Sequence, residues 1–357
     1  MKFKIAVAKG DGVGPEVVDG AIRVLEKISE VFGHEFDFVD VLVGGAAYDR
    51  FNHPLPDETI QIIKESDSVL FGAVGGEKWD HLPNELRPEK AILGLRKALN
   101  VYSNIRPGIL FPSFSDASPL KKEIIKDGFD ICVVRELVGG IYFGEKGRSS
   151  SSGVEEAFDV ERYDENEIER IARSAFNFAM KRKLKLTSVD KANVLESSKL
   201  WRQVVEKVWK DYPTVVLKHL YIDNAAMQLI KDPNQFDVIL TSNIFGDILS
   251  DEISMLTGSI GLLPSASIGE GRIGIYEPIH GSAPDIQGMN IANPVGAILS
   301  AAMMLEHSFN LKTEAEAIRS GVNRVFEMGY GTSDIRIEGI KTLGTREMSN
   351  LIAENIN

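Results

Sequence analysis

The chain alternates short runs of consecutive apolar residues with longer stretches in which apolar residues recur every three or four positions. The first unit is an apolar run at residues 5–8, a glycine-rich turn at residues 10–14, and a stretch at residues 17–28 with helical spacing. The run predicts a strand and the stretch an amphipathic helix. Because such units recur along the sequence, we predict an α/β fold.

Charged residues follow several of the predicted strands. Five apolar runs lead into such a residue, at Arg106, Arg135, Lys191, Asp223 and Asp247. Ligands of open α/β sheets bind outside the carboxyl ends of the strands. We therefore expect these charges to converge on one binding site. For any of them taken alone, a solvated strand end explains the charge.

Two aspartates four positions apart, Asp247 and Asp251, come shortly after an apolar run at residues 238–242. A helix beginning near Gly246 would place both carboxylates on one face. Close like charges repel unless a cation or a proton lies between them, which indicates a hard, oxygen-preferring metal ion. The alternative is an exposed helix start with acids near its positive dipole end. With Asp223 as a third oxygen ligand and no His or Cys cluster nearby, the set favours Mg²⁺ or Mn²⁺ over zinc.

Further side chains suit acid–base chemistry on a carboxylate substrate. Three arginines supply planar forks that match carboxylates: Arg96, Arg106 and Arg135. They predict a small substrate with at least one carboxylate, and we expect two. Lys191 is the candidate general base and Tyr142 the candidate acid; a surface ion pair of Lys191 with Asp190 and a packed Tyr142 ring are the alternatives. A metal site, a general base, a general acid and carboxylate-binding arginines (the carboxylate clamps) together suit oxidation of a hydroxy acid followed by decarboxylation.

The composition narrows the class of protein. The 357 residues include 52 acidic and 40 basic side chains, a net charge of -12, which disfavours binding to nucleic acid or anionic membranes. The single cysteine, Cys132, excludes a disulfide within one chain and a cysteine-based zinc site. The first residues are too weakly apolar for a signal peptide, and no segment approaches a membrane span. We therefore expect a cytoplasmic protein.

The spacing of the glycines leaves the hydride acceptor open. Residues 10–14 have the spacing G-x-G-x-G, whereas a Rossmann dinucleotide site has G-x-G-x-x-G. A Rossmann interpretation would use Asp40 as the ribose-binding acid, but a tight turn without a ligand explains these glycines better. The glycine-punctuated stretch at residues 269–293 predicts a long loop, and loops of that length in compact domains are usually functional.

Ten segments form a recognisable set: residues 10–16 (GDGVGPE), 95–96 (LR), 104–107 (NIRP), 135–136 (RE), 140–144 (GIYFG), 189–194 (VDKANV), 223–224 (DN), 243–252 (NIFGDILSDE), 277–286 (EPIHGSAPDI) and 291–294 (IANP). They resemble the metal-dependent decarboxylating dehydrogenases, the family that includes isocitrate and 3-isopropylmalate dehydrogenases. The resemblance covers nearly the whole chain. It implies a two-domain fold with a sheet through each domain flanked by helices, which is not a Rossmann fold.

The resemblance also implies how the chain is divided. The first domain would be discontinuous, with residues 1–100 and 258–357. It would enclose a central domain at residues 101–257, which bears a polar Gly/Ser-rich arm at about residues 141–165. The sequence leaves open whether this arm is a loose loop or grips a partner.

The same resemblance implies a cofactor and a homodimer. NAD⁺ would bind on a loop outside any Rossmann unit, at Glu277, His280, Gly281, Ser282, Ala283, Asp285, Ile286 and Asn293. An aspartate at position 285 can bond the ribose hydroxyls and would repel a 2′-phosphate, which selects NAD⁺ over NADP⁺. The active site would be shared, with Lys191, Val194 and Asp223 supplied by the neighbouring subunit.

The choice of substrate within the family is expected to depend on one helix, which starts near residue 88. Isocitrate enzymes typically place a serine and an asparagine before the equivalent of Arg96, whereas this chain has Lys90 and Ile92 there. The side-chain pocket would consist of Glu89, Ile92, Leu93 and Val194. It is apolar apart from one acid, so a third carboxylate would be repelled and an isopropyl group would be accommodated. The expected reaction is the oxidative decarboxylation of 3-isopropylmalate in leucine biosynthesis.

Other interpretations stay open at the level of sequence. A close rival enzyme would act on isocitrate, homoisocitrate, tartrate or malate. A metal-dependent phosphotransferase would also use paired carboxylates, but the chain lacks G-x-x-x-x-G-K-[ST]. A third possibility is a non-catalytic dimeric scaffold, against which the intact set of charges argues.

Overall fold

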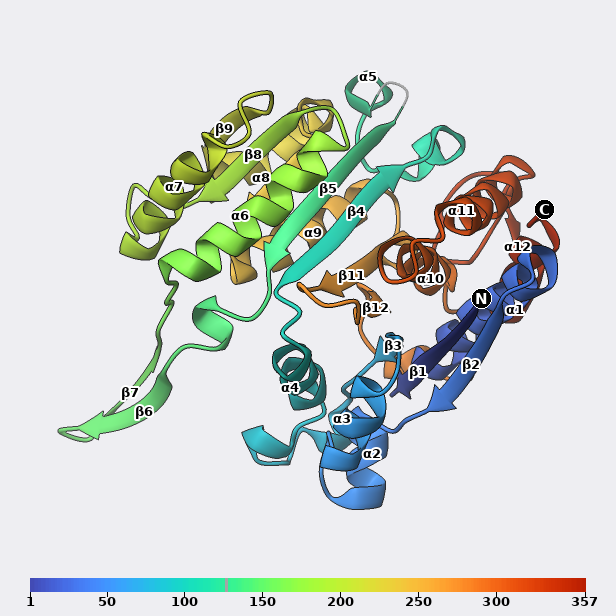
Figure 1. The fold of residues 1–357 in the computed structure, drawn as a ribbon, viewed down its shortest axis with the longest axis horizontal. Helices are drawn as coiled ribbons and strands as arrows, with labels where there is room; N and C mark the ends of the chain where they lie inside the picture. The colour runs from blue at the N-terminus through green and yellow to red at the C-terminus, as the bar shows by residue number, and fades with distance from the viewer. Residues whose placement is uncertain (126–127) are drawn as a thin grey trace.

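A computed structural model describes residues 1–125 and 128–357, and its centre is one mixed sheet covered by helices (Figure 1). The sheet has ten strands in the order β2-β1-β3-β12-β11-β4-β5-β10-β8-β9. Their bounds are β1 Lys2–Gly10, β2 Glu35–Asp40, β3 Ser68–Ala73, β4 Ser103–Leu110, β5 Phe129–Glu136, β8 Lys185–Asp190, β9 Val216–Tyr221, β10 Val238–Thr241, β11 Pro264–Ile268 and β12 Ile275–Pro278.

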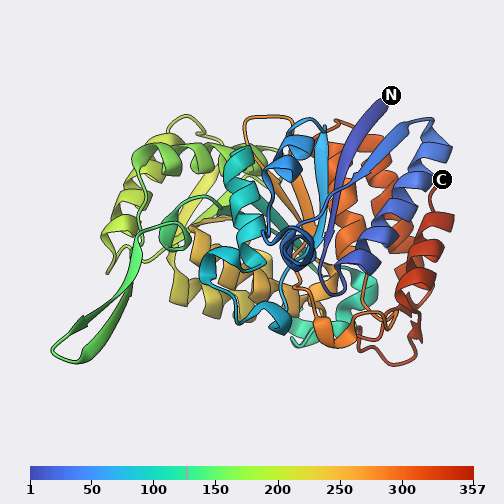
Figure 2. The ribbon, with the colours of Figure 1, turned by 90° about the horizontal axis from the view of Figure 1, so that it is seen from below.

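The helices lie on both faces of this sheet (Figures 1 and 2). Their bounds are α1 Gly14–Phe32, α2 Gly44–Phe51, α3 Asp57–Lys64, α4 Glu89–Leu99, α5 Lys122–Ile125, α6 Glu165–Met180, α7 Glu196–Trp209, α8 Ile222–Lys231, α9 Asn243–Leu256, α10 Val295–His307, α11 Lys312–Glu327 and α12 Thr345–Glu354. In the described part of the chain, no helix combines the length and apolar character that crossing a membrane requires.

The directions of the strands distinguish this sheet from a Rossmann sheet. The outer strands on each side pair in parallel, whereas β11 pairs antiparallel with β12 and with β4, and β4 pairs antiparallel with β5. A Rossmann sheet is mostly parallel with another strand order. The predicted α/β class without a Rossmann fold is therefore confirmed, and one continuous sheet runs through both halves of the molecule.

The strand order follows the predicted division of the chain. Strands from residues 1–100 and 258–357 are neighbours in one half of the sheet, and strands from residues 101–257 form the other half. The halves meet where β11 pairs with β4, with Ala266 opposite Ile105. In Figure 1 the first group includes the strands labelled β1, β2, β3, β11 and β12, and the second those labelled β4, β5, β8 and β9. The domain boundaries themselves stay a prediction.

The first strand–helix unit has the predicted form. Helix α1 starts with a proline in its first turn and ends at Gly33, whose φ of 71° places it in the left-handed region that glycine tolerates. Its apolar positions Val17, Ala21 and Leu25 are all 0% exposed and face the core. The apolar spacing therefore predicted this helix correctly, because the apolar residues of one helix face are the ones buried against the core.

Two predictions about the strands were wrong. Arg106 does not end its strand, because β4 continues to Leu110, and β4 runs antiparallel to its neighbours. The stretch at residues 269–293 is not loop throughout, since it contains β12, which pairs with β3 and β11. Glycines on both sides of β12 favour a loop prediction, so this strand of four buried residues was missed.

The polar arm is a two-stranded antiparallel hairpin, not a loose loop. Strand β6, Lys146–Ser151, pairs with β7, Val154–Asp159. It projects far from the rest of the molecule (Figures 1 and 2). Val154 and Phe158 are 64% and 44% exposed. An isolated hairpin is marginally stable in water, so this one is suited to packing against another surface.

Candidate active site

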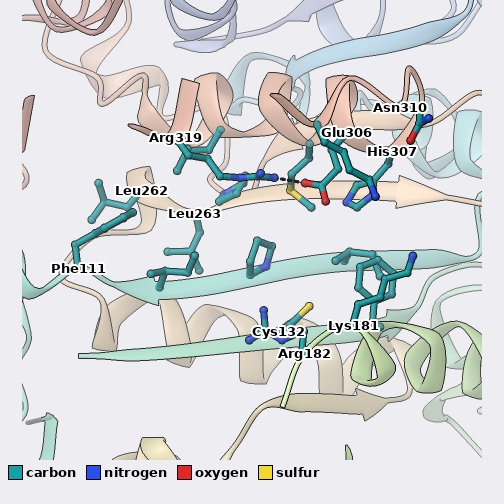
Figure 3. A pocket seen from close by; sticks show the side chains of 18 residues that line it. Phe111, Cys132, Lys181, Arg182, Leu262, Leu263, Glu306, His307, Asn310 and Arg319 are labelled. Atoms are coloured by element: carbon teal, nitrogen blue, oxygen red, sulfur yellow. Dashed lines mark hydrogen bonds and ion pairs between the residues drawn. The ribbon is translucent and has the colours of Figure 1, made fainter. Parts of the chain in front are cut away.

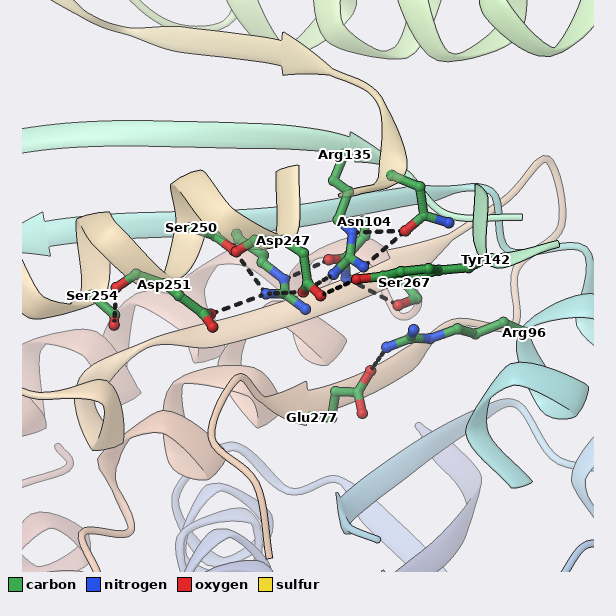
Figure 4. A network of polar contacts seen from close by, with 12 residues as sticks. Arg96, Asn104, Arg135, Tyr142, Asp247, Ser250, Asp251, Ser254, Ser267 and Glu277 are labelled. Carbon is green, nitrogen blue, oxygen red and sulfur yellow. Dashed lines mark hydrogen bonds and ion pairs between the residues drawn. The ribbon is translucent and has the colours of Figure 1, made fainter. Parts of the chain in front are cut away.

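Five of the predicted residues meet at one cluster, on β4, β5, α9 and the short turn Gly140–Tyr142 (Figure 4). The Asp247 carboxylate accepts a hydrogen bond of 2.5 Å from Arg135 Nη1 and one of 2.9 Å from the Tyr142 hydroxyl. Arg106 Nη1 lies 3.5 Å from Asp247 and 3.8 Å from Asp251. The structure thus brings two predicted carboxylate clamps, the candidate acid and two predicted metal ligands into one contact network.

The start of α9 explains how Asp247 reaches Arg135. The helix begins at Asn243, three residues before the predicted start, and Asp247 and Asp251 occupy successive turns. A Cβ atom on Gly246 would lie 2.6 Å from Arg135 Cγ, so only glycine allows this close approach. The position of Asp247 therefore depends on a glycine next to it in the sequence.

Three residues that sequence reasoning missed hold the two guanidinium groups in place. Asn243 Oδ1 accepts from Arg135 Nε at 3.1 Å and from Nη2 at 2.8 Å. Asn104 Oδ1 accepts from Arg106 Nε at 2.6 Å, and Ser250 Oγ accepts from Arg106 Nη1 at 2.7 Å. The available signal was spacing: Asn104 is two positions from Arg106 on one strand face, and Asn243 and Ser250 are four before and three after Asp247.

Burial and charge set the ionisation of this cluster. Arg135 is 2% exposed, and burial lowers its pKa to about 9, so it stays charged at pH 7. Burial opposes ionisation of Asp247, but the Arg135 and Arg106 guanidinium groups outweigh it and hold the pKa of Asp247 below its usual range. Burial dominates at Asp251 and raises the pKa of its carboxyl. Burial, reinforced by Asp247, raises the pKa of Tyr142, so this phenol is a proton donor at neutral pH.

Arg96 approaches the cluster from the other half of the sheet. It extends from α4, and its Nη2 donates to Glu277 Oε1 on β12 at 2.8 Å. Both side chains are only 10% exposed, and Arg96 Nε is buried without a hydrogen-bond partner. Glu277, predicted to contact the cofactor, therefore lies beside a predicted substrate clamp. The free donor of Arg96 suits an anionic ligand between the two halves.

The predicted base, Lys191, and the predicted metal ligand Asp223 form a separate pair. Lys191 Nζ donates to Asp223 Oδ1 at 2.5 Å, and the Asp223 side chain is 61% exposed. Asp190, the alternative partner of Lys191, is buried and instead accepts two hydrogen bonds from Arg202, so that alternative is wrong. Val194, on the turn after Lys191, is 63% exposed.

The predicted metal ligands do not assemble within one chain. Among residues 1–125 and 128–357, no group of three His, Cys, Asp or Glu side chains is placed to hold a metal ion. Asp247 and Asp251 provide two oxygen donors on one face, and the Asp251 side chain is 60% exposed. These donors fit a hard divalent cation, provided that a third carboxylate is supplied from outside the chain.

The predicted cofactor loop lines a pocket of about 350 Å³, together with Val13, Ser333 and Asp334. Predicted residues in its wall are His280, Gly281, Ala283, Ile286 and Asn293. His280 Nε2 is buried without a partner, and burial lowers the pKa of this imidazole, so a neutral ring lines the pocket. This unpartnered nitrogen and the apolar wall fit an adenosine group.

The other predicted cofactor residues have different positions. Asp285 is exposed beside this wall, whereas Ser282 is buried and its carbonyl accepts from Val13 N at 2.8 Å. Ser282 therefore joins the loop to the start of α1. Sequence reasoning missed Asp334, which lines the pocket and accepts from Asn293 Nδ2 at 3.0 Å. No sequence spacing could indicate this contact, because 41 positions separate the two residues.

The loop is fixed at a second point by Glu16, in the first turn of α1. Its carboxylate accepts from Gly288 N at 2.5 Å and from Asn290 N at 3.1 Å. The backbone of the loop is thus held by the same helix that the glycine turn introduces. This explains why a tight glycine turn without a Rossmann fingerprint lies close to a predicted nucleotide site.

The predicted specificity residues are only partly brought together. Glu89 and Leu93 share a pocket of about 240 Å³ with Tyr142 and Lys146. Ile92 packs instead against a buried apolar cluster, and Val194 belongs to the separate region of Lys191. Two of the four side chains therefore face the candidate acid in this chain.

Comparisons with known proteins agree in the family that they indicate. A family model described as isocitrate/isopropylmalate dehydrogenase matches residues 4–352. The 3-isopropylmalate dehydrogenase of Clostridium acetobutylicum is 57% identical over 351 residues, 98% of each chain. That of Aquifex aeolicus is 54% identical over 356 residues, which is 99% of this chain and 97% of the relative.

Solved structures give the same result. Isocitrate dehydrogenase from Methylococcus capsulatus is 32% identical, with a TM-score of 0.88 and 99% of both chains covered. A beta-decarboxylating dehydrogenase from Thermococcus kodakarensis is 36% identical, with a TM-score of 0.80, over 99% of this chain and 96% of the other.

Proposed function

Because this chain belongs to the isocitrate/isopropylmalate dehydrogenase family, we propose that it catalyses the NAD-dependent oxidative decarboxylation of 3-isopropylmalate. The products are 4-methyl-2-oxopentanoate and CO₂, and the pathway is leucine biosynthesis. Relatives named 3-isopropylmalate dehydrogenase that are 54 to 57% identical over almost the full chain support this substrate over isocitrate. The structure named isocitrate dehydrogenase is 32% identical.

One observation carries the proposal: the contact network of the buried Arg106 and Arg135 with Tyr142 and Asp247. Two guanidinium groups, fixed by Asn243, Asn104 and Ser250, present donors to a common space. Arg96 adds a third from the opposite half of the sheet. Such preorganised forks bind the two carboxylates of a malate derivative with little loss of side-chain freedom.

The metal site would combine Asp247 and Asp251 with Asp223 of a second copy of the chain. A bound Mg²⁺ or Mn²⁺ would supply Lewis acidity to the substrate hydroxyl oxygen, which becomes the carbonyl oxygen. Lys191, from the same second copy, removes the hydroxyl proton. Tyr142 delivers a proton to the carbon that loses CO₂, a role that suits a phenol kept protonated by burial and by Asp247.

The cofactor would be NAD⁺, held at the pocket of His280, Gly281, Ala283, Ile286 and Asn293, with Ser282 fixing the loop. The exposed Asp285 carboxylate beside this wall would bond the ribose hydroxyls and repel a 2′-phosphate. Glu277 lies between this loop and Arg96 and would contact the nicotinamide end. When bound there, NAD⁺ would supply the hydride acceptor for oxidation of the hydroxyl-bearing carbon.

A homodimer is required by this arrangement, because Lys191, Val194 and Asp223 do not meet Asp247 within one chain. Exposed apolar side chains on α8 and α9 support such an interface: Met227, Ile230, Ile248 and Met255 are 61%, 52%, 55% and 56% exposed. The projecting hairpin would extend the contact. We propose the domain division at residues 101–257 on the same grounds, because it leaves Arg96 and Arg135 on opposite sides of the substrate.

One assay tests the proposal. NADH formation is measured with 3-isopropylmalate, isocitrate and malate, each with Mn²⁺ and again with excess chelator. We expect the highest kcat/KM with 3-isopropylmalate and loss of activity on chelation. A higher kcat/KM for isocitrate would instead assign the chain to the other branch of the family, and ATP consumption without NADH formation would indicate a phosphotransferase.

A further inference from the structure

One cavity of the described residues lies away from the catalytic cluster. It has a volume of about 560 Å³ and lies between the end of α6 on one side and α10 and α11 on the other, over β4 and β5 (Figure 3). We call it the rear cleft, and its lining used below is Ile105, Pro107, Leu263, Met303, Lys181 and Lys312. Cavities of this size accommodate a small organic ligand.

Strand β4 separates the rear cleft from the catalytic cluster. Side chains of a strand alternate between its two faces. Ile105, Pro107 and Ile109 line the rear cleft, whereas Arg106 between them bonds Asn104 and Ser250 on the opposite face. A ligand in the rear cleft would therefore lie one strand thickness from a proposed substrate clamp without touching the substrate.

The rear cleft has an apolar floor, formed by residues such as Ile105 and Met303, and a cationic rim that includes Lys181 and Lys312. Four cationic side chains line the cleft against one acid, Glu306, in a chain of net charge -12. Two of these cations are already compensated: Arg182 pairs with Asp130 and Asp237, and Arg319 with Glu306. Lys181 and Lys312 have no carboxylate within 4.0 Å among the described residues.

The two lysines belong to opposite walls. Lys181 directly follows the last residue of α6, and Lys312 is the first residue of α11. The walls touch at one end, where the Phe178 and His307 rings meet edge to face at 5.8 Å. Burial lowers the pKa of His307, so this ring is neutral at pH 7 and does not add to the cationic rim.

We propose that the rear cleft binds an amphiphilic monocarboxylate, with the apolar body on Ile105, Pro107, Leu263 and Met303 and the carboxylate between Lys181 and Lys312. A dicarboxylate would place its second charge on the apolar floor, and a neutral lipid would leave both lysines uncompensated. Because Ile105 and Pro107 flank Arg106 on β4, a ligand that shifts them would also shift this clamp and lower the affinity for a di-acid substrate.

Binding is tested with decanoate, a probe of this class, by titration calorimetry on the full chain without substrate or cofactor. The variant Lys181→Glu/Lys312→Glu reverses the rim charge, and Lys64→Glu on the exposed surface of α3 is the matched control. We expect one site per chain, weakened at least about tenfold by the double reversal and unchanged in the control. Thermal unfolding checks that both variants fold.

Each outcome decides the proposal. Absence of decanoate binding, or equal binding by the double variant, overturns it. Equal affinity for decan-1-ol would show an apolar groove without the carboxylate site and also overturns it. A second measurement rests on the proposed function: decanoate should raise the KM for 3-isopropylmalate in the parent and not in the double variant. If decanoate binds but leaves the KM unchanged, the claim that the rear cleft affects substrate affinity is wrong. Absence of any dehydrogenase activity would contradict the proposed function and leave the binding result valid.

Discussion

The two charged regions proposed to make one active site differ in how far a single chain completes them. In the Arg106–Arg135–Asp247 cluster both arginines are buried, and their guanidinium groups are held by Asn104, Asn243 and Ser250. The Lys191–Asp223 pair is partly exposed. The Lys191 backbone N–H donates to Ser198, and the Lys191 side chain donates to Asp223. The first is preorganised by its own fold, whereas the second needs a surface that this chain does not provide to itself. The comparison predicts that the second region gains its function only on assembly.

The largest effect is expected from Lys191→Ala. Loss of the proposed general base should lower kcat about 10²- to 10⁴-fold. The lysine pairs with one exposed carboxylate, so unfolding temperature should change little. Lys207→Ala, on the exposed face of α7, is the control. A Lys191→Ala enzyme that retains the parental kcat would remove the lysine from the mechanism.

Mixed dimers provide the sharpest test of the comparison. Lys191→Ala and Asp247→Asn chains should each be nearly inactive, because every site in either homodimer lacks one group. In a heterodimer of the two, a shared arrangement places both defects in one site and restores the other, so about half of the parental activity per dimer should return. Differently tagged chains, coexpressed and purified as heterodimers, give this measurement. No recovery would mean that Lys191 and Asp247 serve the same chain.

A smaller effect is expected from Arg135→Lys. The ammonium keeps the charge but cannot make the paired bonds to Asn243 and Asp247 together with a substrate carboxylate. Losing one charge-assisted hydrogen bond of about 1.5–3 kcal/mol should reduce kcat/KM for 3-isopropylmalate about 10- to 100-fold. Arg173→Lys on the outside of α6 should leave this ratio unchanged. The decisive measurement is steady-state kinetics at saturating Mn²⁺ and NAD⁺.

Leu93→Ala should alter selectivity more than catalysis. Leu93 shares its pocket with Glu89 and Tyr142, so truncation removes apolar contact with the proposed isopropyl group. We expect kcat/KM for 3-isopropylmalate to fall about tenfold and that for malate to change less than twofold, which corresponds to about 1 kcal/mol of discrimination. Leu99→Ala on the same helix is the control. Equal losses for both substrates would place the isopropyl group elsewhere.

The comparison also explains which parts of the site could be predicted from sequence. Asp247 and Asp251 were found because a helix repeats its face every three to four residues and both lie in one helix. Arg106 was identified as a site residue, but it was wrongly placed at the end of its strand. The direction of that strand depends on its pairing with distant strands and not on the local pattern. Asp334 was missed for the same reason: only the folded chain brings it to Asn293.

The fold itself was predicted where local and tertiary preferences agree. Helix α1 has a proline start, a glycine end and a regular apolar face, and each feature favours the same structure. Strand β12 lies between glycine-rich segments that locally favour turns, and it forms because β3 and β11 offer hydrogen bonds on both sides. Sequence pattern therefore misses an element whose stability comes mainly from its neighbours.

The smallest expected effect is the dependence of stability on pH at Asp247. Arg135 and Arg106 hold the folded pKa of this carboxyl below the ordinary value of 3.8, so the folded state binds its proton less readily than the unfolded state. The stabilisation is therefore fully present above about pH 4 and is lost as the pH falls through the depressed folded pKa. Unfolding temperatures of the parent and of Asp247→Asn should differ by a constant amount from pH 7 to pH 5 and converge below pH 4. Asp251→Asn should show the opposite trend, because burial raises the pKa of Asp251 and its ionised form destabilises the folded chain. Parallel profiles for both variants would mean that the two aspartates have the same environment, contrary to the contact of Asp247 with two guanidinium groups.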